Sequence, residues 1–566
     1  MLIRVGKHGA CTLHGAELER IRPPLMAFAD PHRINTWMCY WDVLAGILQA
    51  LKVKDREVDQ VSRENWHACK RRDAVLRDKV RDTVDPGLDV SSCFSKEYQP
   101  EQYQLKAGQR NYVVGRLLNA DPVGMGKTLS SWVTAEIIRR EQGQCKTVVI
   151  CLASLKWQWR SELLLYTNER MKALVVTGTQ EERTRIYTRF AEAKGSATII
   201  LNYDLLMRDA YNGLSRAIDS ADYVITDEAS KLKNRGTKTT KAYKLLTQRV
   251  KWKSALTATP IEVGVENLYS IMESLDPLML GTMTLYKGTY TKSFPIKLKT
   301  GITIYKPTGY RNLPDLNHRV AARRVRRLPQ DEGVHLPEIR AQVIWAELGP
   351  KQRSAYDSAV SGVLRGLEED KDVNPMVVVG DALRACLSGA LVGAAGPGIK
   401  STMIVDQLSD ESADEQALVF SESKAYLRDE LVPMLQKAGV KAELLCGDTS
   451  MMERQQMQRS FNAEELRVLC MTSAGERGLN LPCGLVLDVD VPWNPSRLTQ
   501  RAGRARRYGS KYEHVRVLNY LTLGTVEERV LERVLGRRSL SEAVVGAEES
   551  DNVGYKLTSR DLSTIL

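Results

Sequence analysis

The chain has 566 residues, and at about 150 residues per domain this length predicts three to four domains and excludes a single small binding module. Hydrophobic residues make up 43% of the chain and charged residues 27%, which is typical of a folded globular protein and excludes a wholly disordered one. The net charge of +12 favours a polyanionic partner. No apolar run approaches the length of about 18 to 20 residues that a membrane span needs, and the ten cysteines form no CxxC pair. We therefore expect a cytoplasmic protein with reduced thiols and no membrane partner.

Residues 1–95 differ in pattern from the rest of the chain. They carry one apolar stripe at helical spacing, formed by Trp37, Trp41, Leu44, Leu48 and Leu51. A charged stretch follows around residues 70–72. We expect a small, mainly helical accessory domain with a solvated basic face.

Two later stretches alternate short apolar runs with helical segments, one between about residues 110 and 275 and the other from about residue 400 onward. The strand-like runs are TVVICLAS, ALVVTG, ATIILNY, DYVITDEAS and KSALTATP in the first stretch and QALVFSES, AELLCGD, LRVLCMTS, GLVLDVDV and HVRVLNYL in the second. Such near-continuous apolar runs are typical of strands buried on both faces of a parallel sheet. We expect two α/β lobes, at residues 96–280 and 400–566, joined by a basic and mostly helical region at 281–399.

The segment Asp121-Pro-Val-Gly-Met-Gly-Lys-Thr128 precedes a helical pattern and has the chemistry of a phosphate-binding loop. Gly124 and Gly126 let backbone N–H groups close around phosphates at a helix N-terminus. Lys127 can reach the β and γ phosphates, and the Thr128 hydroxyl can hold Mg²⁺. The segment lacks the first glycine of the full pattern, so an incidental tight turn is the alternative.

Two neighbouring carboxylates, Asp227 and Glu228, end a strand-like apolar run one hundred residues after Lys127. Asp227 can hold Mg²⁺ through water, and Glu228 can orient or deprotonate the attacking water. A pair of surface acids at a strand end is the alternative. The phosphate-loop pattern earlier in the chain favours a catalytic role for Asp227 and Glu228.

The second α/β stretch contributes Gln500-Arg-Ala-Gly-Arg504-Ala-Arg-Arg507. Charge that develops on a transferred phosphoryl group needs a guanidinium from outside the nucleotide-holding lobe, and Arg504 and Arg507 suit that role. A solvated basic turn is the alternative. Together these motifs predict an ATPase whose site is completed when two lobes close, which is the design of a nucleic-acid motor.

Most of the excess positive charge lies in residues 281–330. This stretch holds eleven basic residues against one acid, a net charge of +10, and it interleaves them with aromatic residues. We expect Lys292, Lys297 and Lys299 to contact nucleic-acid phosphates. The alternative is that these cations cover acidic surfaces of the two lobes or are solvated.

Over residues 98–566 the chain resembles the Swi/Snf-type ATPases of helicase superfamily two. The resemblance rests on an ordered set of motifs: Tyr103–Gln104, Asp121–Thr128, Ser154–Leu155 with Gln158–Trp159, Asn202–Tyr203, Asp227–Ser230 with Lys233–Asn234, Leu256–Ile261, Gly309–Leu316, Gly475–Leu481, Trp493–Pro495, Gln500–Arg507 and Gly524–Arg529. It implies two tandem RecA-like lobes with parallel sheets that use ATP and Mg²⁺. It also implies that Gln104 reads adenine, that Gln500 contributes to nucleotide binding, and that Trp493 contributes to nucleic-acid binding.

The chain departs from the family pattern at four positions. Pro122 replaces a glutamate, and Ser230 replaces a histidine that lies between the ATP site and the arginine motif in the family. Arg501 and Arg506 replace an alanine and a histidine. The Ser230 departure bears on how hydrolysis is coupled to movement, and Ser230 and Pro122 together bear on whether the ATP cycle is intact.

The activity that the resemblance implies is ATP-dependent movement along double-stranded DNA, with remodelling of DNA structures or displacement of bound proteins. Forked or branched DNA and a protein cargo such as RNA polymerase are further expected partners, and a bacterial or phage member would be nucleoid-associated. One alternative is a strand-separating DNA or RNA helicase, and another is a DNA-binding scaffold with an impaired ATPase. No strand-splitting hairpin is identifiable between Arg467 and Arg507, so we expect movement without sustained strand separation.

Overall fold

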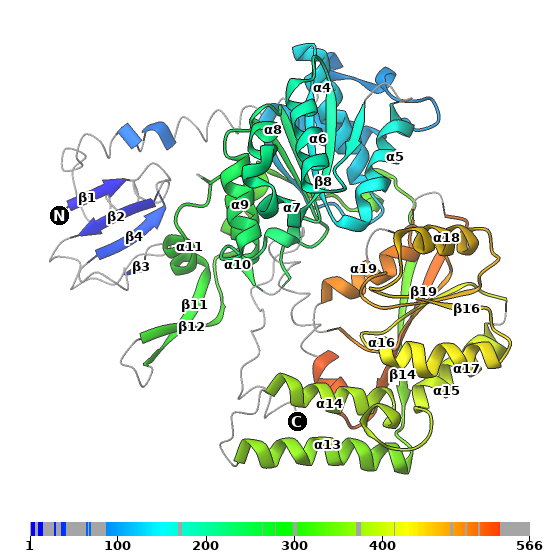
Figure 1. Cartoon of the computed structure of the whole chain (residues 1–566). Coiled ribbons are helices and arrows are strands. Elements are labelled where there is room, and N and C mark those ends of the chain that lie inside the picture. Colours follow the sequence, from blue (N-terminus) through cyan, green and yellow to red (C-terminus); the bar gives the residue numbers. More distant parts are fainter. Residues whose placement is uncertain are drawn as a thin grey trace. The chain divides into compact units, whose positions relative to one another are not determined.

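The computed structural model divides into two compact units (Figure 1). It describes residues 2–5, 10–14, 28–29, 36–40, 64–65, 67–69, 86–167, 172–262, 264–277, 279–297, 303–368, 375–412, 414–475, 479–492, 495–507 and 510–531. Unit 1 takes Met1–Pro122 and Gly126–Leu328, and unit 2 takes Pro329–Arg538 together with Val123–Met125. Among the described helices, none combines the length and apolarity that crossing a membrane requires.

Unit 1 is built on a seven-stranded sheet in which every neighbouring pair is parallel. Its strands, in spatial order, are β13 (Arg324–Val325), β5 (Arg116–Asn119), β10 (Trp252–Leu256), β9 (Tyr223–Asp227), β6 (Lys146–Cys151), β8 (Ala197–Asn202) and β7 (Ala173–Val175). All six residues of β6 are buried, as the continuous apolar run predicted. The sheet therefore has helices on both of its faces.

The helices of unit 1 follow the strands in alternation. They are α3 (Gln102–Val114), α4 (Lys127–Gln142), α5 (Lys156–Tyr166), α6 (Gln180–Glu192), α7 (Tyr203–Arg208), α8 (Ser215–Asp219), α9 (Lys238–Thr247) and α10 (Val265–Leu275). Val149 and Cys151 of β6 belong to the apolar cluster of α3, α4 and α5, whereas Val148 and Ile150 belong to the cluster of α6 to α9. Because successive strand residues point to opposite faces, these two clusters are the two sides of the sheet.

Beyond α10, unit 1 continues through α11 (Met283–Tyr290), an antiparallel hairpin of β11 (Thr291–Lys297) and β12 (Thr303–Tyr310), and α12 (Leu313–Ala321) (Figure 1). Tyr286 and Tyr290 are fully buried in the cluster that α10, α11 and α12 share. The Tyr286 hydroxyl donates to the Val265 carbonyl at 2.8 Å, and Tyr290 donates to the Asp315 carboxylate. These aromatic residues of the basic stretch therefore form core contacts.

The described strands of the N-terminal region form an antiparallel sheet, so the mainly helical domain expected there is wrong for these residues. The strands are β1 (Leu2–Val5), β2 (Ala10–His14), β4 (Thr36–Tyr40) and β3 (Phe28–Ala29), in that spatial order. Trp37, the first residue of the expected helical stripe, lies in β4 opposite Leu13, and the other four stripe residues lie outside the described part of the chain. Trp37 pairs with a residue 24 positions earlier in the chain, and apolar spacing does not reveal that partner.

Unit 2 is built on a second all-parallel sheet, of six strands. In spatial order they are β14 (Glu338–Ala346), β19 (His514–Thr522), β18 (Leu485–Asp488), β15 (Ala417–Phe420), β17 (Val468–Met471) and β16 (Ala442–Leu445). The helices are α13 (Pro350–Glu368), α14 (Pro375–Leu387), α15 (Ile399–Asp406), α16 (Lys424–Tyr426), α17 (Val432–Lys437), α18 (Met451–Asn462) and α19 (Pro495–Ala505). Apolar clusters with α15 to α17 and with α18 and α19 cover opposite faces. The two parallel-sheet lobes are thus confirmed.

Candidate functional site

The candidate site of unit 1 lies where neighbouring parallel strands end. The strands β5, β10 and β9 lie side by side, and each is followed directly by one of the predicted motifs. Asp121 comes shortly after β5, Thr257 follows β10, and Asp227 ends β9. Because parallel strands present their carboxyl ends at one sheet edge, these motifs meet there.

The phosphate-loop segment forms a tight turn that opens helix α4. Gly124 and Gly126 have φ angles of 94° and 65°, and Gly126 is the residue directly before the helix, which begins at Lys127. A left-handed backbone at these positions favours glycine. The helix therefore begins at this turn, and the N-terminus of a helix suits a bound anion because its first N–H groups point along the helix axis.

Gln104 lies directly against this loop. A Cβ at position 126 would lie 2.2 Å from Gln104 Nε2, so any side chain there would have to displace that amide. Gln104 is buried, and its Oε1 accepts the backbone N–H of Glu101 at 2.9 Å. Its Nε2 donates to the Tyr103 hydroxyl at 3.2 Å. The fold thus places the residue expected to read adenine next to the loop expected to hold phosphates.

Lys127 is held inside the loop by backbone carbonyls. Its Nζ donates to the carbonyl oxygens of Asp121 and Pro122, at 2.8 and 3.0 Å. The same ammonium acts to lower the pKa of Asp227, which places its charge near that carboxylate. The structure therefore brings the two predicted motifs together.

The carboxylate of Asp227 has a donor on each oxygen. Oδ1 accepts the backbone N–H of Glu228 and Oδ2 accepts the indole N–H of Trp159, both at 2.9 Å. Burial, with a smaller contribution from the charge of Glu228, raises the pKa of Asp227 to about 6. A half-buried carboxylate held in this way can bind a cation.

The backbone at Glu228 adopts an unusual conformation. Its φ of 49° and ψ of 52° lie in the left-handed region, which costs a non-glycine residue about 1 to 3 kcal/mol. The Tyr203 hydroxyl donates to the carbonyl oxygens of Asp227 and Glu228 and so supports this backbone. Ser230, at the position of the family histidine, lies with its hydroxyl 3.5 Å from Glu228 Oε2.

The donor set fits Mg²⁺ that arrives with a nucleotide. Thr128 supplies a half-buried hydroxyl and Asp227 a carboxylate. Mg²⁺ usually takes only one or two protein oxygens and completes its shell with phosphate oxygens and water. The described residues contain no group of three or more His, Cys, Asp or Glu side chains that could hold a metal ion.

The predicted nucleotide-site residues of the second lobe lie in α19 or directly after it. Arg504 Nη1 and Arg507 Nη2 both donate to the Leu479 carbonyl, at 2.8 and 3.0 Å. Gln500 is buried, and its carbonyl oxygen is 3.4 Å from Arg504 Nε. These three residues are thus gathered within unit 2, while Lys127, Asp227 and Glu228 are gathered within unit 1.

Arg501, one of the departures from the family pattern, is fully buried in an acidic cluster. It donates to Asp488 at 2.9 Å and to Glu422 at 2.6 Å, and also to the Asp490 carbonyl at 3.0 Å. Asp490 in turn accepts the Ser421 hydroxyl at 2.6 Å. Arg501 therefore neutralises carboxylates inside unit 2, a role that its spacing from Arg504 did not indicate.

The basic stretch divides into two parts in the structure. Arg323 and Arg326 donate to backbone carbonyl oxygens of unit 1, and Arg327 donates to the Asp121 carboxylate. Lys292 is exposed on β11, and Lys297 is the last residue of that strand. Lys299 and Trp493 lie outside the described residues. Phe294, next to these lysines in sequence, is 62% exposed.

Three contacts at the site escaped the sequence reasoning: those of Trp159, Tyr203 and Arg327. Trp159 and Tyr203 belong to recognised motifs, yet nothing in their spacing assigns them hydrogen bonds to Asp227 or Glu228. The Arg327 guanidinium binds the buried Asp121 carboxylate and the Tyr103 carbonyl, and it lies 5.0 Å from the centre of the Tyr103 ring. In the sequence, only the arginine-rich composition of this stretch indicated that an arginine could lie at the site.

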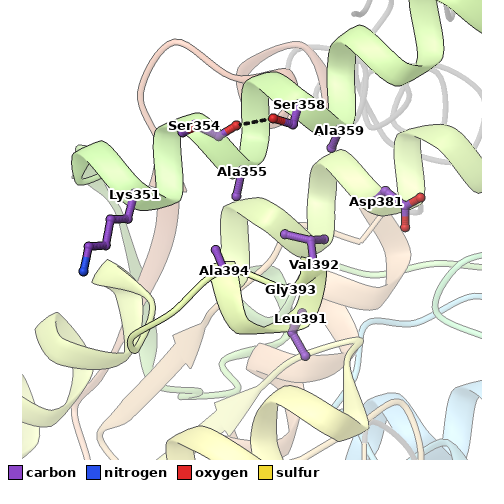
Figure 2. A pocket seen from close by; sticks show the side chains of 10 residues that line it. All are labelled: Lys351, Ser354, Ala355, Ser358, Ala359, Asp381, Leu391, Val392, Gly393 and Ala394. Carbon is purple, nitrogen blue, oxygen red and sulfur yellow. Dashed lines mark hydrogen bonds between the residues drawn. The ribbon is translucent and has the colours of Figure 1, made fainter.

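A second concave feature, in unit 2, lies between α13, α14 and the loop after residue 392. Figure 2 shows small side chains such as Ala355 along this hollow, with Lys351 and Asp381 at opposite ends. Its volume is about 520 Å³. Asp381 forms an ion pair with Arg384. The side chains lining it bring no acid, base and nucleophile together, and we assign it no chemistry.

Comparison with known proteins gives the same picture as the motifs. The profile of the SNF2-related domain matches residues 98–387, and that of the helicase conserved C-terminal domain matches residues 400–509. An uncharacterized ATP-dependent helicase of Bacillus subtilis, YqhH, is 25% identical over 500 residues, covering 82% of this chain and 82% of its own length. The human DNA repair and recombination protein RAD54B is 24% identical over 503 residues, covering 78% of this chain and 53% of its own.

Other relatives are longer than this chain. The probable ATP-dependent DNA helicase CHR23 of Arabidopsis thaliana is 25% identical, and the match covers 83% of this chain but 45% of the relative. The chain thus spans about half the length of the plant and human relatives and most of the length of the Bacillus one.

Proposed function

Because the chain belongs to the SNF2 family of ATP-dependent, helicase-like enzymes, we propose that it couples ATP hydrolysis in unit 1 to movement along double-stranded DNA. The observation that carries the proposal is the meeting of Lys127 with Asp227 and Glu228 at one edge of a parallel sheet, beside a glycine turn that opens a helix. Relatives named as DNA helicases and as DNA repair proteins support DNA as the partner.

Each residue of unit 1 has a distinct task in this proposal. Lys127 leaves the carbonyls of Asp121 and Pro122 and binds the β and γ phosphates. Thr128 and Asp227 hold Mg²⁺, which when bound neutralises charge on the phosphate oxygens. Glu228 accepts a proton from the attacking water or orients it. Gln104, packed on the loop, hydrogen-bonds the adenine.

The residues of α19 complete the reaction from unit 2. Arg504 and Arg507 give up the Leu479 carbonyl and place guanidinium charge on the transferred phosphoryl group, while Gln500 contributes to nucleotide binding. A guanidinium that stabilises charge only in the transition state raises the turnover rate. Hydrolysis is then coupled to closure of the two units.

The lysines of the hairpin region and Trp493 form the proposed DNA contact. Lys292 is exposed, and Lys297 and Lys299 follow it along the same basic stretch. Contacts to phosphates are independent of base sequence and weaken as salt rises. Forked or branched DNA and a bound protein such as RNA polymerase are the proposed targets of the movement.

The test compares phosphate release by the wild type with double-stranded, single-stranded and forked DNA and with RNA. We expect the largest stimulation with duplex or forked DNA, and Glu228→Gln serves as the inactive control. Triplex displacement then measures movement, and we expect it to require ATP while a tailed duplex stays paired in the same buffer. Efficient unwinding of the tailed duplex with no triplex displacement would replace the proposal by a strand-separating helicase. Binding of DNA with no phosphate release, whether DNA is present or absent, would favour a DNA-binding scaffold with an impaired ATPase.

A further inference from the structure

Trp159 lies at the site, and the proposed chemistry assigns it no role. It is in α5, follows the short helical turn η5 (Ala153–Leu155) after β6, and is 2% exposed. Its Nε1 lies 2.9 Å from Asp227 Oδ2, across 68 positions of sequence. The helix that follows β6 therefore delivers one directed hydrogen bond to the carboxylate that ends β9.

This hydrogen bond fixes how the carboxylate is turned. The Glu228 backbone N–H binds Oδ1, and the indole N–H binds Oδ2, so each oxygen has one donor. The terminal torsion of an aspartate is broad, and a single donor leaves the group free to turn about it. Two donors on opposite oxygens restrict that torsion and leave the remaining lone pairs of both oxygens for a cation.

We propose that Trp159 is a positioning residue that orients the Asp227 carboxylate for Mg²⁺. The inference rests on the proposed function, since Asp227 is assigned there as a magnesium ligand. Hydrogen bonds that orient metal ligands typically change metal affinity or activity by about 10 to 100-fold when they are removed. Trp159 acts through Asp227 and does not touch the phosphates.

The chain contains a matched control in the neighbouring indole. Trp132 lies in α4, is fully buried, and packs edge-on against Trp159, with ring centroids 5.7 Å apart. Within the described part of the chain, its Nε1 has no hydrogen-bond partner. Replacing either indole by phenylalanine removes a similar volume from the same apolar cluster, but only one replacement removes a donor from Asp227.

Tyr203 supports the same carboxylate from the backbone side. Its hydroxyl donates to the carbonyl oxygens of Asp227 and Glu228, whereas Trp159 binds the Asp227 side chain. Loss of the Tyr203 hydroxyl is therefore expected to affect the position of Glu228 as well. Loss of the Trp159 N–H is expected to affect metal binding first.

The test measures binding of Mn²⁺, as a spectroscopic substitute for Mg²⁺, in the presence of a non-hydrolysable ATP analogue. Electron paramagnetic resonance of free Mn²⁺ gives the dissociation constant for the wild type, Trp159→Phe and Trp132→Phe. We expect Mn²⁺ affinity about 10 to 100-fold weaker in Trp159→Phe and unchanged in Trp132→Phe. Raised Mg²⁺ should restore turnover in Trp159→Phe, because the hydrolytic groups are intact.

If Trp159→Phe does not fold, a sulfur-containing analogue of tryptophan at position 159 provides a second test. Benzothienylalanine at position 159 keeps the bicyclic shape of indole and lacks the N–H. Wild-type Mn²⁺ affinity in either folded protein, or an equal loss in Trp132→Phe, would overturn the inference. DNA-stimulated phosphate release by the wild type is measured alongside, and its absence would refute the proposed function while the Mn²⁺ comparison still decides the role of Trp159. A wild type that binds no Mn²⁺ with the nucleotide would overturn both.

Discussion

Replacing Arg327 by glutamine should destabilise unit 1 strongly, because it leaves a buried carboxylate without its cation. The Asp121 side chain is 0% exposed, and the Arg327 side chain that binds it is 14% exposed. Arg327 meets the carboxylate with its backbone N–H at 3.0 Å and Nε at 3.2 Å, and also with Nη2. In Arg327→Gln only the backbone donor is certain to remain. Removing one partner of a buried pair costs about 3 to 5 kcal/mol.

Urea unfolding followed by tryptophan fluorescence measures this loss, because the buried indoles of Trp132, Trp159 and Trp252 all lie in unit 1. With a urea dependence of about 3 kcal/mol per molar, the midpoint should fall by about 1 to 2 M. Arg216→Gln breaks an exposed surface pair with Glu192 in unit 1 and should leave the midpoint unchanged. A second variant that also carries Asp121→Asn should recover part of the loss. An unchanged midpoint in Arg327→Gln, or additive losses in the double variant, would refute the reasoning.

Four further outcomes are expected. Lys127→Ala and Glu228→Gln should each abolish phosphate release with unchanged circular dichroism, and Glu228→Gln should still bind ATP; normal turnover in either would remove the proposed site. Arg504→Gln should lower DNA-stimulated turnover by orders of magnitude with a smaller change in nucleotide affinity. An unaltered turnover rate would show that Arg504 has only a structural role. Neutralising the three lysines of the hairpin region together should weaken DNA binding and flatten its salt dependence, whereas unchanged affinity and slope would mean that they are merely solvated. Burial lowers the pKa of Lys253 from 10.5 to about 7. Between these two pH values the unfolded chain binds one more proton than the folded chain, so the free energy of unfolding should rise with pH in the wild type relative to Lys253→Met. Equal pH profiles of urea unfolding for the two proteins would contradict this expectation.

The two lobes were predictable from the sequence because their strands are short, apolar and regularly spaced. The run at residues 146–151 is buried at every position, and the runs that became β9, β10, β15, β17 and β18 behave similarly. Burial on both faces of a parallel sheet demands such runs, so the sequence pattern and the structure have one cause. The glycine turn and the Asp227-Glu228 pair were predictable because each is a short motif of neighbouring residues.

Strands that are exposed or paired far along the chain were missed. Most residues of β14 are exposed, including Trp345 at 46%, so it lacks the continuous burial that marks the other strands. In the N-terminal region, Trp37 has helical spacing to later apolar residues but is used in a strand opposite Leu13. Its conformation depends on a partner strand that local spacing does not identify.

The sequence alone thus determined the fold class and indicated the groups to which we assign the proposed chemistry, because short, local patterns encode both. Tertiary structure decided how those groups are held. Arg327 and Asp121 are 206 positions apart, and Trp159 and Asp227 are 68 apart. Whether an arginine in a basic stretch binds a buried carboxylate or faces solvent depends on what the folded sheet edge brings beside it, and composition and spacing do not contain that information.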